Sequence, residues 1–166
     1  MSGGLIHRDR LPDASRRVVA AGLALGLDVD VHEFPEGTKT SQDAADAVGC
    51  ALGAITKSLV FVVDTDPVLA LLPGDRRLDT SKLATAHGGK LARRATLDEV
   101  RISTGFTAGG TPPFGHDLPT YADEALKEHT ERWAAAGTPS TVFPISLDSL
   151  IAATGARWVD VTEEAF

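Results

Sequence analysis

Two apolar segments separated by three polar residues constrain the fold of this chain most strongly. Residues 56–63 (TKSLVFVV) and 67–72 (PVLALL) are rich in β-branched and aliphatic side chains, and Asp64, Thr65 and Asp66 lie between them. This pattern predicts a β-hairpin with a short polar turn. Because both faces of each predicted strand are apolar, we expect the hairpin at the centre of a sheet that is covered on both sides.

Further helices and strands are predicted on both sides of this hairpin. Helices are expected where a capping residue precedes an amphipathic segment and a glycine follows it, at residues 11–26, 41–48, 79–87, 96–105 and 147–154. Strands are expected at residues 29–34, 90–95, 120–122, 132–136, 141–146 and 158–161. Since the two types alternate without a regular βαβ period, we predict an α/β (α+β) fold with a central mixed or barrel-like sheet surrounded by helices.

The length of 166 residues predicts a single domain over residues 1–166, with an N-terminal helix at about 11–26 and a core at about 29–161. The one cysteine, Cys50, excludes an intramolecular disulfide and favours a reducing compartment. The N-terminus is polar, and no segment approaches the ~18 apolar residues of a spanning helix. We therefore expect a cytoplasmic protein without a membrane partner.

The charge is unevenly distributed along the chain. The net charge of −7, from 16 Lys and Arg against 23 Asp and Glu, argues against nonspecific binding of nucleic acid. Residues 76–101 nevertheless carry an excess of basic side chains, among them Arg76, Arg77, Lys82, Arg93 and Arg94. This segment is either an ordinary solvated surface or a patch that faces phosphates.

Lys57 stands at the start of the first hairpin strand, on the face that strand alternation gives to Leu59, Phe61 and Val63. An ammonium group beside so much apolar surface needs a partner or a ligand. The alternative is a lysine whose long side chain reaches water at the strand end.

Residues 107–116 (TAGGTPPFGH) combine three glycines with two prolines. The glycines permit close backbone approach and the prolines restrict the loop to one conformation. Its N–H groups could polarise a carbonyl or hold an oxyanion, although a merely rigid connection fits the same residues. The loop lacks the GxxxxGK[ST] pattern of a phosphate-binding loop.

No metal or cofactor is predicted. The five histidines are scattered without an HExxH motif, no GxSxG elbow occurs, and Cys50 is expected to be structural.

Five segments occur in a characteristic order between about Val31 and Val161: SQDAADAVG, TKSLVFVV, ALLPGDRRLDTSKLA, TGFTAGGTPPFG and DSLIAATGARWVDV. In this order and spacing the chain resembles the YbaK family, the free-standing relatives of the editing domain inserted in bacterial prolyl-tRNA synthetases. Members hydrolyse amino acids from wrongly charged tRNA. The resemblance implies a trans-acting aminoacyl-tRNA deacylase that removes a small noncognate amino acid from mischarged tRNA, of the proline type or related, in translation quality control. A synthetase or an elongation factor as a further partner, and the oligomeric state, are left open.

The resemblance also implies roles for individual residues. Lys57 matches the lysine needed for deacylation, and the segment Gly109 to Pro113 matches the GxxxP loop whose backbone lines the aminoacyl pocket. We accordingly expect a catalytic group of Lys57, Gly109 and Gly110. The expected substrate-binding residues are Thr40, Thr111, Pro112, Pro113, Phe114, Gly115 and His116, and the expected tRNA-binding residues are Arg76, Arg77, Lys82, Arg93 and Arg94.

One departure from the family pattern concerns the amino acid that is removed. Members that remove cysteine from proline tRNA typically continue the loop as GGxSPxG, whereas Pro112 takes the serine position here and His116 and Asp117 follow. The amino acid that is removed could therefore be alanine, serine, threonine or another small residue as well as cysteine.

Two other functions are compatible with the sequence. One is a tRNA- or synthetase-binding module that keeps the fold without the chemistry. The other is a small-molecule enzyme that uses Lys57 as a Schiff-base amine.

Overall fold

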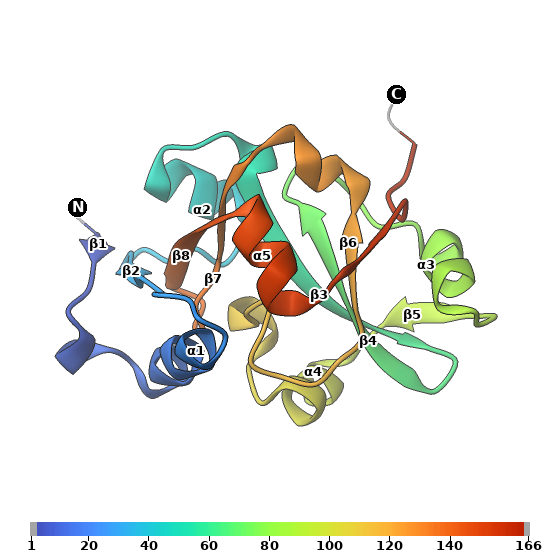
Figure 1. The fold of residues 1–166 in the computed structure, drawn as a ribbon, viewed down its shortest axis with the longest axis horizontal. Coiled ribbons are helices and arrows are strands. Elements are labelled where there is room, and N and C mark those ends of the chain that lie inside the picture. The colour runs from blue at the N-terminus through green and yellow to red at the C-terminus, as the bar shows by residue number, and fades with distance from the viewer. Residues whose placement is uncertain (1–2, 165–166) are drawn as a thin grey trace.

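The computed structural model describes residues 3–164 (Figure 1). Within them, nine strands form one sheet in the order β1-β2-β8-β7-β3-β4-β6-β9, and β5 pairs with β3 beside this path. The strands are β1 (Gly4–Leu5), β2 (His32–Glu33), β3 (Ile55–Val63), β4 (Asp66–Pro73), β5 (Ala92–Arg94), β6 (Thr120–Asp123), β7 (Glu131–Ala135), β8 (Thr141–Ser146) and β9 (Arg157–Val159). The α-helices are α1 (Asp13–Ala24), α2 (Ser41–Val48), α3 (Thr80–His87), α4 (Leu97–Thr104) and α5 (Leu147–Thr154). The 3-10 helices are η1 (Arg8–Arg10), η2 (Leu52–Ala54), η3 (Ala108–Gly110) and η4 (Glu124–Glu128).

The predicted central hairpin is confirmed. Strands β3 and β4 pair antiparallel along their whole length, from Thr56 opposite Pro73 to Val63 opposite Asp66. Asp64, whose φ is +56°, turns the chain, and its carboxylate accepts hydrogen bonds from the backbone N–H groups of two residues just before β5. The turn side chain therefore ties the hairpin to the segment that follows α3.

Each face of the hairpin packs into a core of its own. Val60 and Val62 of β3 belong to a cluster with α1, α4, α5 and β8, while Phe61 and Val63 belong to a second cluster with α3 and β9. The sequence predicts that side chains of β3 alternate between two faces, and the structure confirms this assignment.

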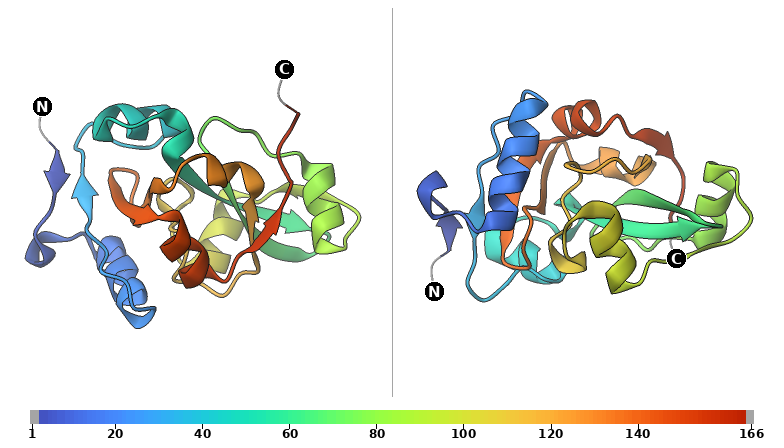
Figure 2. Two further views of the ribbon diagram at one scale, coloured as in Figure 1. Left: turned by 45° about the horizontal axis from the view of Figure 1, so that its top comes forward. Right: turned by 90° about the horizontal axis from the view of Figure 1, so that it is seen from below.

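The sheet is mixed, as predicted. The β3·β7, β4·β6 and β6·β9 pairs are parallel, and the remaining pairs are antiparallel. Figure 2 shows α1 beside β2 and β8 at one end of the sheet, and α3 at the opposite end beside the β3–β4 hairpin. The arrangement leaves the beginning of β3 between α2 and the η3 turn.

Local capping signals position four of the helices. Thr40, Asp79, Thr96 and Ser146 each accept a backbone N–H bond at the start of α2, α3, α4 and α5, and a left-handed glycine follows each of these helices. Thr96 and Glu99 form the reciprocal capping box that the sequence predicts.

Three predicted strands are shorter or displaced in the structure. Residues 29–34 form a strand only at His32–Glu33, and Val29 and Val31, which precede it, are buried in the core beside α1. Residues 90–95 are a strand only at Ala92–Arg94, and the last strand ends at Val159. Among residues 3–164, no helix combines the length and apolar character that crossing a membrane requires.

Candidate functional site

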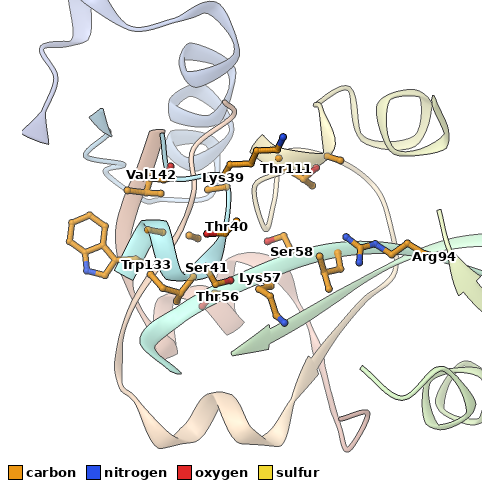
Figure 3. Close-up of a pocket in the computed structure, with 18 residues that line it drawn as sticks. Lys39, Thr40, Ser41, Thr56, Lys57, Ser58, Arg94, Thr111, Trp133 and Val142 are labelled. Carbon is orange, nitrogen blue, oxygen red and sulfur yellow. The ribbon is translucent and has the colours of Figure 1, made fainter. Parts of the chain in front are cut away.

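A cavity of about 350 Å³ opens where the start of β3 meets α2, β7 and the η3 turn (Figure 3). It brings together residues that are far apart in the sequence, including Lys57 of β3 and Gly109 of the glycine-rich loop. Its polar lining residues are Thr38, Lys39, Thr40, Ser41, Thr56, Lys57, Ser58, Arg94 and Thr111. Several donors of different type therefore face one hollow with apolar walls, which suits a small ligand that has both polar and apolar parts.

Lys57 is half-buried at the edge of this cavity. Its Nζ donates a hydrogen bond to the backbone carbonyl of Arg76, 2.5 Å away. Burial lowers the pKa of Lys57, and the positive charges of Arg94 and Arg77 lower it further, while Asp75 opposes the shift. The hydrogen bond thus fixes the position of the Lys57 ammonium group, and the pKa of this group lies below that of an ordinary lysine.

The two glycines of the loop play different structural roles. Gly109 lines the cavity, whereas Gly110 is buried and turned away from it. Gly110 donates its N–H to the Thr107 carbonyl, and its own carbonyl accepts from the N–H of Gly137. A Cβ atom at position 110 would lie 2.5 Å from the carbonyl carbon of Gly137, so glycine is sterically required there. Gly110 therefore fixes the turn against Gly137, and Gly109 forms part of the cavity wall.

Two of the expected substrate-binding threonines line the same cavity. Thr40 uses its hydroxyl as the cap of α2, accepting from the Asp43 N–H at 3.0 Å. Thr111 is buried, and its hydroxyl donates to the Thr107 carbonyl at 2.9 Å. Both hydroxyls are therefore engaged within the protein and hold the walls of the cavity in place.

The second half of the loop is not brought to Lys57. Pro113, Phe114, Gly115 and His116 line a different hollow, against the C-terminal ends of α1 and α5. Phe114 is buried and packs edge to face on Phe143, with 5.7 Å between ring centroids. These residues form part of the core and its rim, away from the cavity at β3.

Pro112 and His116 belong to that same half of the loop. Pro112 is buried, and its carbonyl lies 3.3 Å from Nε2 of His116. Burial lowers the pKa of His116, against the opposing effects of the Pro112 hydrogen bond and of Asp117. The imidazole therefore favours its neutral form.

The five basic residues expected to bind tRNA fall into two groups. Three of them form ion pairs: Arg76 with Glu128 at 2.7 Å, Lys82 with Asp160 at 3.4 Å, and Arg93 with Glu99 at 2.7 Å. Across residues 3–164, Arg77 and Arg94 are exposed without an ion pair, and Arg94 also lines the cavity. Lys39, which the sequence analysis did not single out, shares this unpaired state and the cavity lining.

Arg132 is a structural residue that sequence reasoning missed. It is fully buried on β7, where its guanidinium donates to Thr56 Oγ1 at 2.7 Å and to the carbonyls of Gly53 and Ile55 at 2.6 and 3.0 Å. It also donates to the carbonyls of Leu126 and His129. Burial lowers its pKa to about 10. Arg132 holds the first residues of β3 just below the cavity, and its neighbours in the sequence give no sign of this role.

The described residues offer no ready metal centre. Between residues 3 and 164, no three His, Cys, Asp or Glu side chains cluster in a way that could hold a metal ion. Cys50 is partly buried among the apolar side chains near α2, and burial raises the pKa of its thiol.

Comparisons with known proteins identify the family of this chain. The family model described as "Aminoacyl-tRNA editing domain" matches residues 35–153. The Bacillus subtilis protein YwhH is 32% identical over 139 residues, which cover 81% of this chain and 88% of that protein. The Enterococcus faecalis protein EbsC, named provisionally as a Cys-tRNA(Pro)/Cys-tRNA(Cys) deacylase, is 29% identical over 136 residues, or 79% of this chain and 83% of the relative.

A solved structure and a synthetase sequence are similar to this chain as well. A crystal structure described provisionally as a trans-editing enzyme for prolyl-tRNA synthetase superimposes with a TM-score of 0.87 at 44% identity, covering 93% of this chain and 99% of the other. The proline–tRNA ligase of Shouchella clausii is 38% identical over 118 residues, which are 70% of this chain but only 20% of that enzyme. The chain therefore belongs to the aminoacyl-tRNA editing domain family.

Proposed function

We propose that this protein is a trans-acting aminoacyl-tRNA deacylase, which hydrolyses the ester of tRNA charged with a small noncognate amino acid. The observation that carries the proposal is the single cavity lined by both Lys57 and Gly109, residues that lie far apart in the sequence. Proline tRNA is the first candidate, because the relatives are named for Cys-tRNA(Pro), for prolyl-tRNA synthetase or as proline–tRNA ligases.

The proposed reaction is the attack of water on the ester carbonyl, which breaks the bond to the ribose oxygen. The products are the free amino acid and a tRNA with its terminal hydroxyl restored. The first N–H groups of the η3 turn have no partner within so short a helix, and those of Ala108 and Gly109 stand at the cavity wall. Such donors stabilise the negative charge that develops on the carbonyl oxygen.

Lys57 supplies a fixed positive charge to the same reaction. Its ammonium is held by the Arg76 carbonyl and faces the charges of Arg94 and Arg77. Lys39, Lys57 and Arg94 line the cavity, and three cations around one cavity suit the terminal phosphate of a tRNA better than a neutral small molecule. Aminoacyl esters are labile, so orientation and charge can supply the catalysis without a strong side-chain base.

The ion pairs of the basic residues narrow the set of side chains that we propose to contact tRNA. Arg77, Arg94 and Lys39 have no ion pair among the described residues, so they can neutralise phosphates without first leaving a carboxylate. Arg76, Lys82 and Arg93 are engaged by carboxylates. We propose that the first three contact the 3′ end of the tRNA and that the other three stabilise the fold.

The proposal is tested with a panel of purified tRNAs for proline, cysteine and alanine, each charged with alanine, cysteine, serine or threonine, together with proline tRNA that is correctly charged with proline. We expect hydrolysis above the spontaneous rate for at least one noncognate pair. Correctly charged prolyl-tRNA should be hydrolysed only at the spontaneous rate. Hydrolysis of none of these esters would contradict the deacylase.

A second candidate is a binding module that keeps the fold but not the chemistry. The engagement of Lys57 Nζ by the Arg76 carbonyl favours it, because this ammonium group is already held by the protein. Saturable binding of the charged tRNAs, with no hydrolysis of any of them, would support this module over the enzyme.

A further inference from the structure

The edge of β3 has a gap at the cavity. One edge of this strand is paired with β4 throughout. On the other edge, Ile55 and Thr56 pair with β7, and Phe61 to Val63 pair with β5. Between these two partners, residues 57–60 have no neighbouring strand in the described part of the chain.

Ser58 directs its main-chain groups into this gap. The Ile55 carbonyl accepts from Gly74 on the β4 side, whereas the Val60 carbonyl accepts from Ala95 on the other side. Because the N–H and C=O of successive residues in a strand alternate between its two edges, those of Ser58 share the side of Val60. They therefore form a one-residue opening in the hydrogen-bonding edge of the sheet.

The side chain of Ser58 is a second, independent sign of a binding site. Its Oγ is buried and has no hydrogen-bond partner within residues 3–164. Buried hydroxyls are almost always hydrogen-bonded in folded proteins, so an unsatisfied one calls for a ligand or a water molecule. Ser58 lines the Lys57 cavity and also an adjoining apolar hollow of about 310 Å³ formed with Leu97 and Val100 of α4.

Lys57 does not compete for this position. Figure 3 shows Lys57 and Ser58 leaving β3 in opposite directions, with Ser58 on the side of Thr40 and Thr111. The ammonium of Lys57 is bound to the Arg76 carbonyl. A second positive group can therefore approach Ser58 from the cavity.

We infer that Ser58 binds the amino-acid part of the substrate as one residue of the missing strand. The Ser58 N–H donates to the acyl carbonyl of the substrate, and the Ser58 carbonyl and Oγ accept from its α-ammonium group. An aminoacyl ester carries one residue's worth of main-chain donors and acceptors, which matches a one-residue opening in a sheet edge. This inference rests on the proposed function, because it assumes that the cavity takes an aminoacyl ester.

Pairing at both ends of the α-carbon has a consequence for selectivity. Once the ammonium and the carbonyl are both held, the side chain and the hydrogen of the α-carbon occupy fixed positions. Exchanging them, as in a D-amino acid, turns the side chain toward the position of the hydrogen. We therefore expect Ser58 to support recognition of the α-amino group and of L-configuration, whichever small side chain is accepted.

The test uses two probes that cannot be hydrolysed at an ester: 3′-alanylamino-3′-deoxyadenosine and its lactyl counterpart, in which a hydroxyl replaces the ammonium. Calorimetry measures the affinity of each for the wild-type protein. We expect the alanyl probe to bind about tenfold more tightly, because hydrogen bonds to a charged group are the stronger ones. In Ser58→Ala the preference falls about fivefold with the loss of one acceptor, and Ser58→Thr restores it.

Ser81→Ala, at an exposed serine of α3, serves as the matched control and keeps the full preference. Equal affinity of the wild-type protein for both probes would overturn the inference, and so would an unchanged preference in Ser58→Ala. Hydrolysis of the charged tRNAs without any probe preference would reject the pairing alone. A clear probe preference without hydrolysis would instead reject the deacylase and leave the pairing intact.

Discussion

At the scale of single residues, Lys57 is the group on whose charge state the proposed deacylation depends most. Burial and the neighbouring Arg94 and Arg77 hold its pKa below the ordinary value, so its charged form is lost at a lower pH than in an exposed lysine. The patterns in the sequence single out the lysine and Gly109 as candidates, and the resemblance to the editing family predicts that they share a pocket, as both line the cavity. Ser58 and Lys39 could not be predicted, since a serine within a strand and a lysine before a helix cap are ordinary until the cavity brings them together.

Removing one of the neighbouring cations should raise the pKa of Lys57. In Arg94→Ala the repulsion from a guanidinium disappears, so we expect the lysine to titrate at higher pH than in the wild-type protein. The alkaline limb of the deacylation profile, corrected for spontaneous hydrolysis, should move in the same direction. NMR titration of ¹³C-labelled lysine side chains measures the shift directly. Arg101→Ala, which removes an arginine paired with Asp98, is the control and should leave the Lys57 titration unchanged.

The two glycines of the loop should respond differently to alanine. At Gly110 the added methyl would meet Gly137 at 2.5 Å and the N atom of Thr138 at 2.6 Å, both backbone, so we expect a loss of about 1–3 kcal/mol in stability. At Gly109 the closest atom is Cγ of Pro139 at 3.5 Å, an ordinary contact, and stability should change by less than about 0.5 kcal/mol. Urea denaturation measures both variants, and equal losses would show that the two positions are not distinguished by packing.

At the scale of the elements, structure that depends on neighbouring residues could be predicted from the sequence, and structure that depends on long-range contacts could not. The hairpin and the caps of α2 to α5 follow from neighbouring residues, and the sequence predicts them well. The parallel pairing of β3 with β7 joins segments about 80 residues apart. No local pattern encodes such a pairing, and the same holds for the placement of Phe114, Gly115 and His116 in a hollow away from Lys57.

Arg132 links these elements, and its removal should destabilise the start of β3. Arg132→Met keeps much of the side-chain volume but leaves the carbonyls of Gly53 and Ile55 without their donor. Buried acceptors without partners are costly, so we expect a loss of about 3 kcal/mol in the free energy of unfolding. Chemical denaturation measures the loss, and hydrogen exchange should show reduced protection at residues 55–57. A loss below about 0.5 kcal/mol, the usual size of a surface effect, would contradict this role.

At the scale of the whole molecule, an acidic protein presents a small basic rim to its proposed substrate. The net charge of −7 coexists with Lys39, Lys57 and Arg94 around one opening, and Arg77 lies near enough to Lys57 to lower its pKa. Several basic residues elsewhere are engaged by carboxylates, as Arg76 is by Glu128. Total charge alone therefore argues against nucleic acid, whereas the distribution of unpaired cations favours contact with the few phosphates near a tRNA terminus.

The most direct test of the central claim is the single-turnover rate of deacylation by Lys57→Ala on the noncognate tRNA that the wild-type protein hydrolyses fastest. We expect the rate to fall to the spontaneous level while circular dichroism and the urea midpoint stay close to those of the wild type. Lys90→Ala, at an exposed lysine that does not line the cavity, is the matched control and should keep the wild-type rate. A wild-type rate in folded Lys57→Ala would contradict the account.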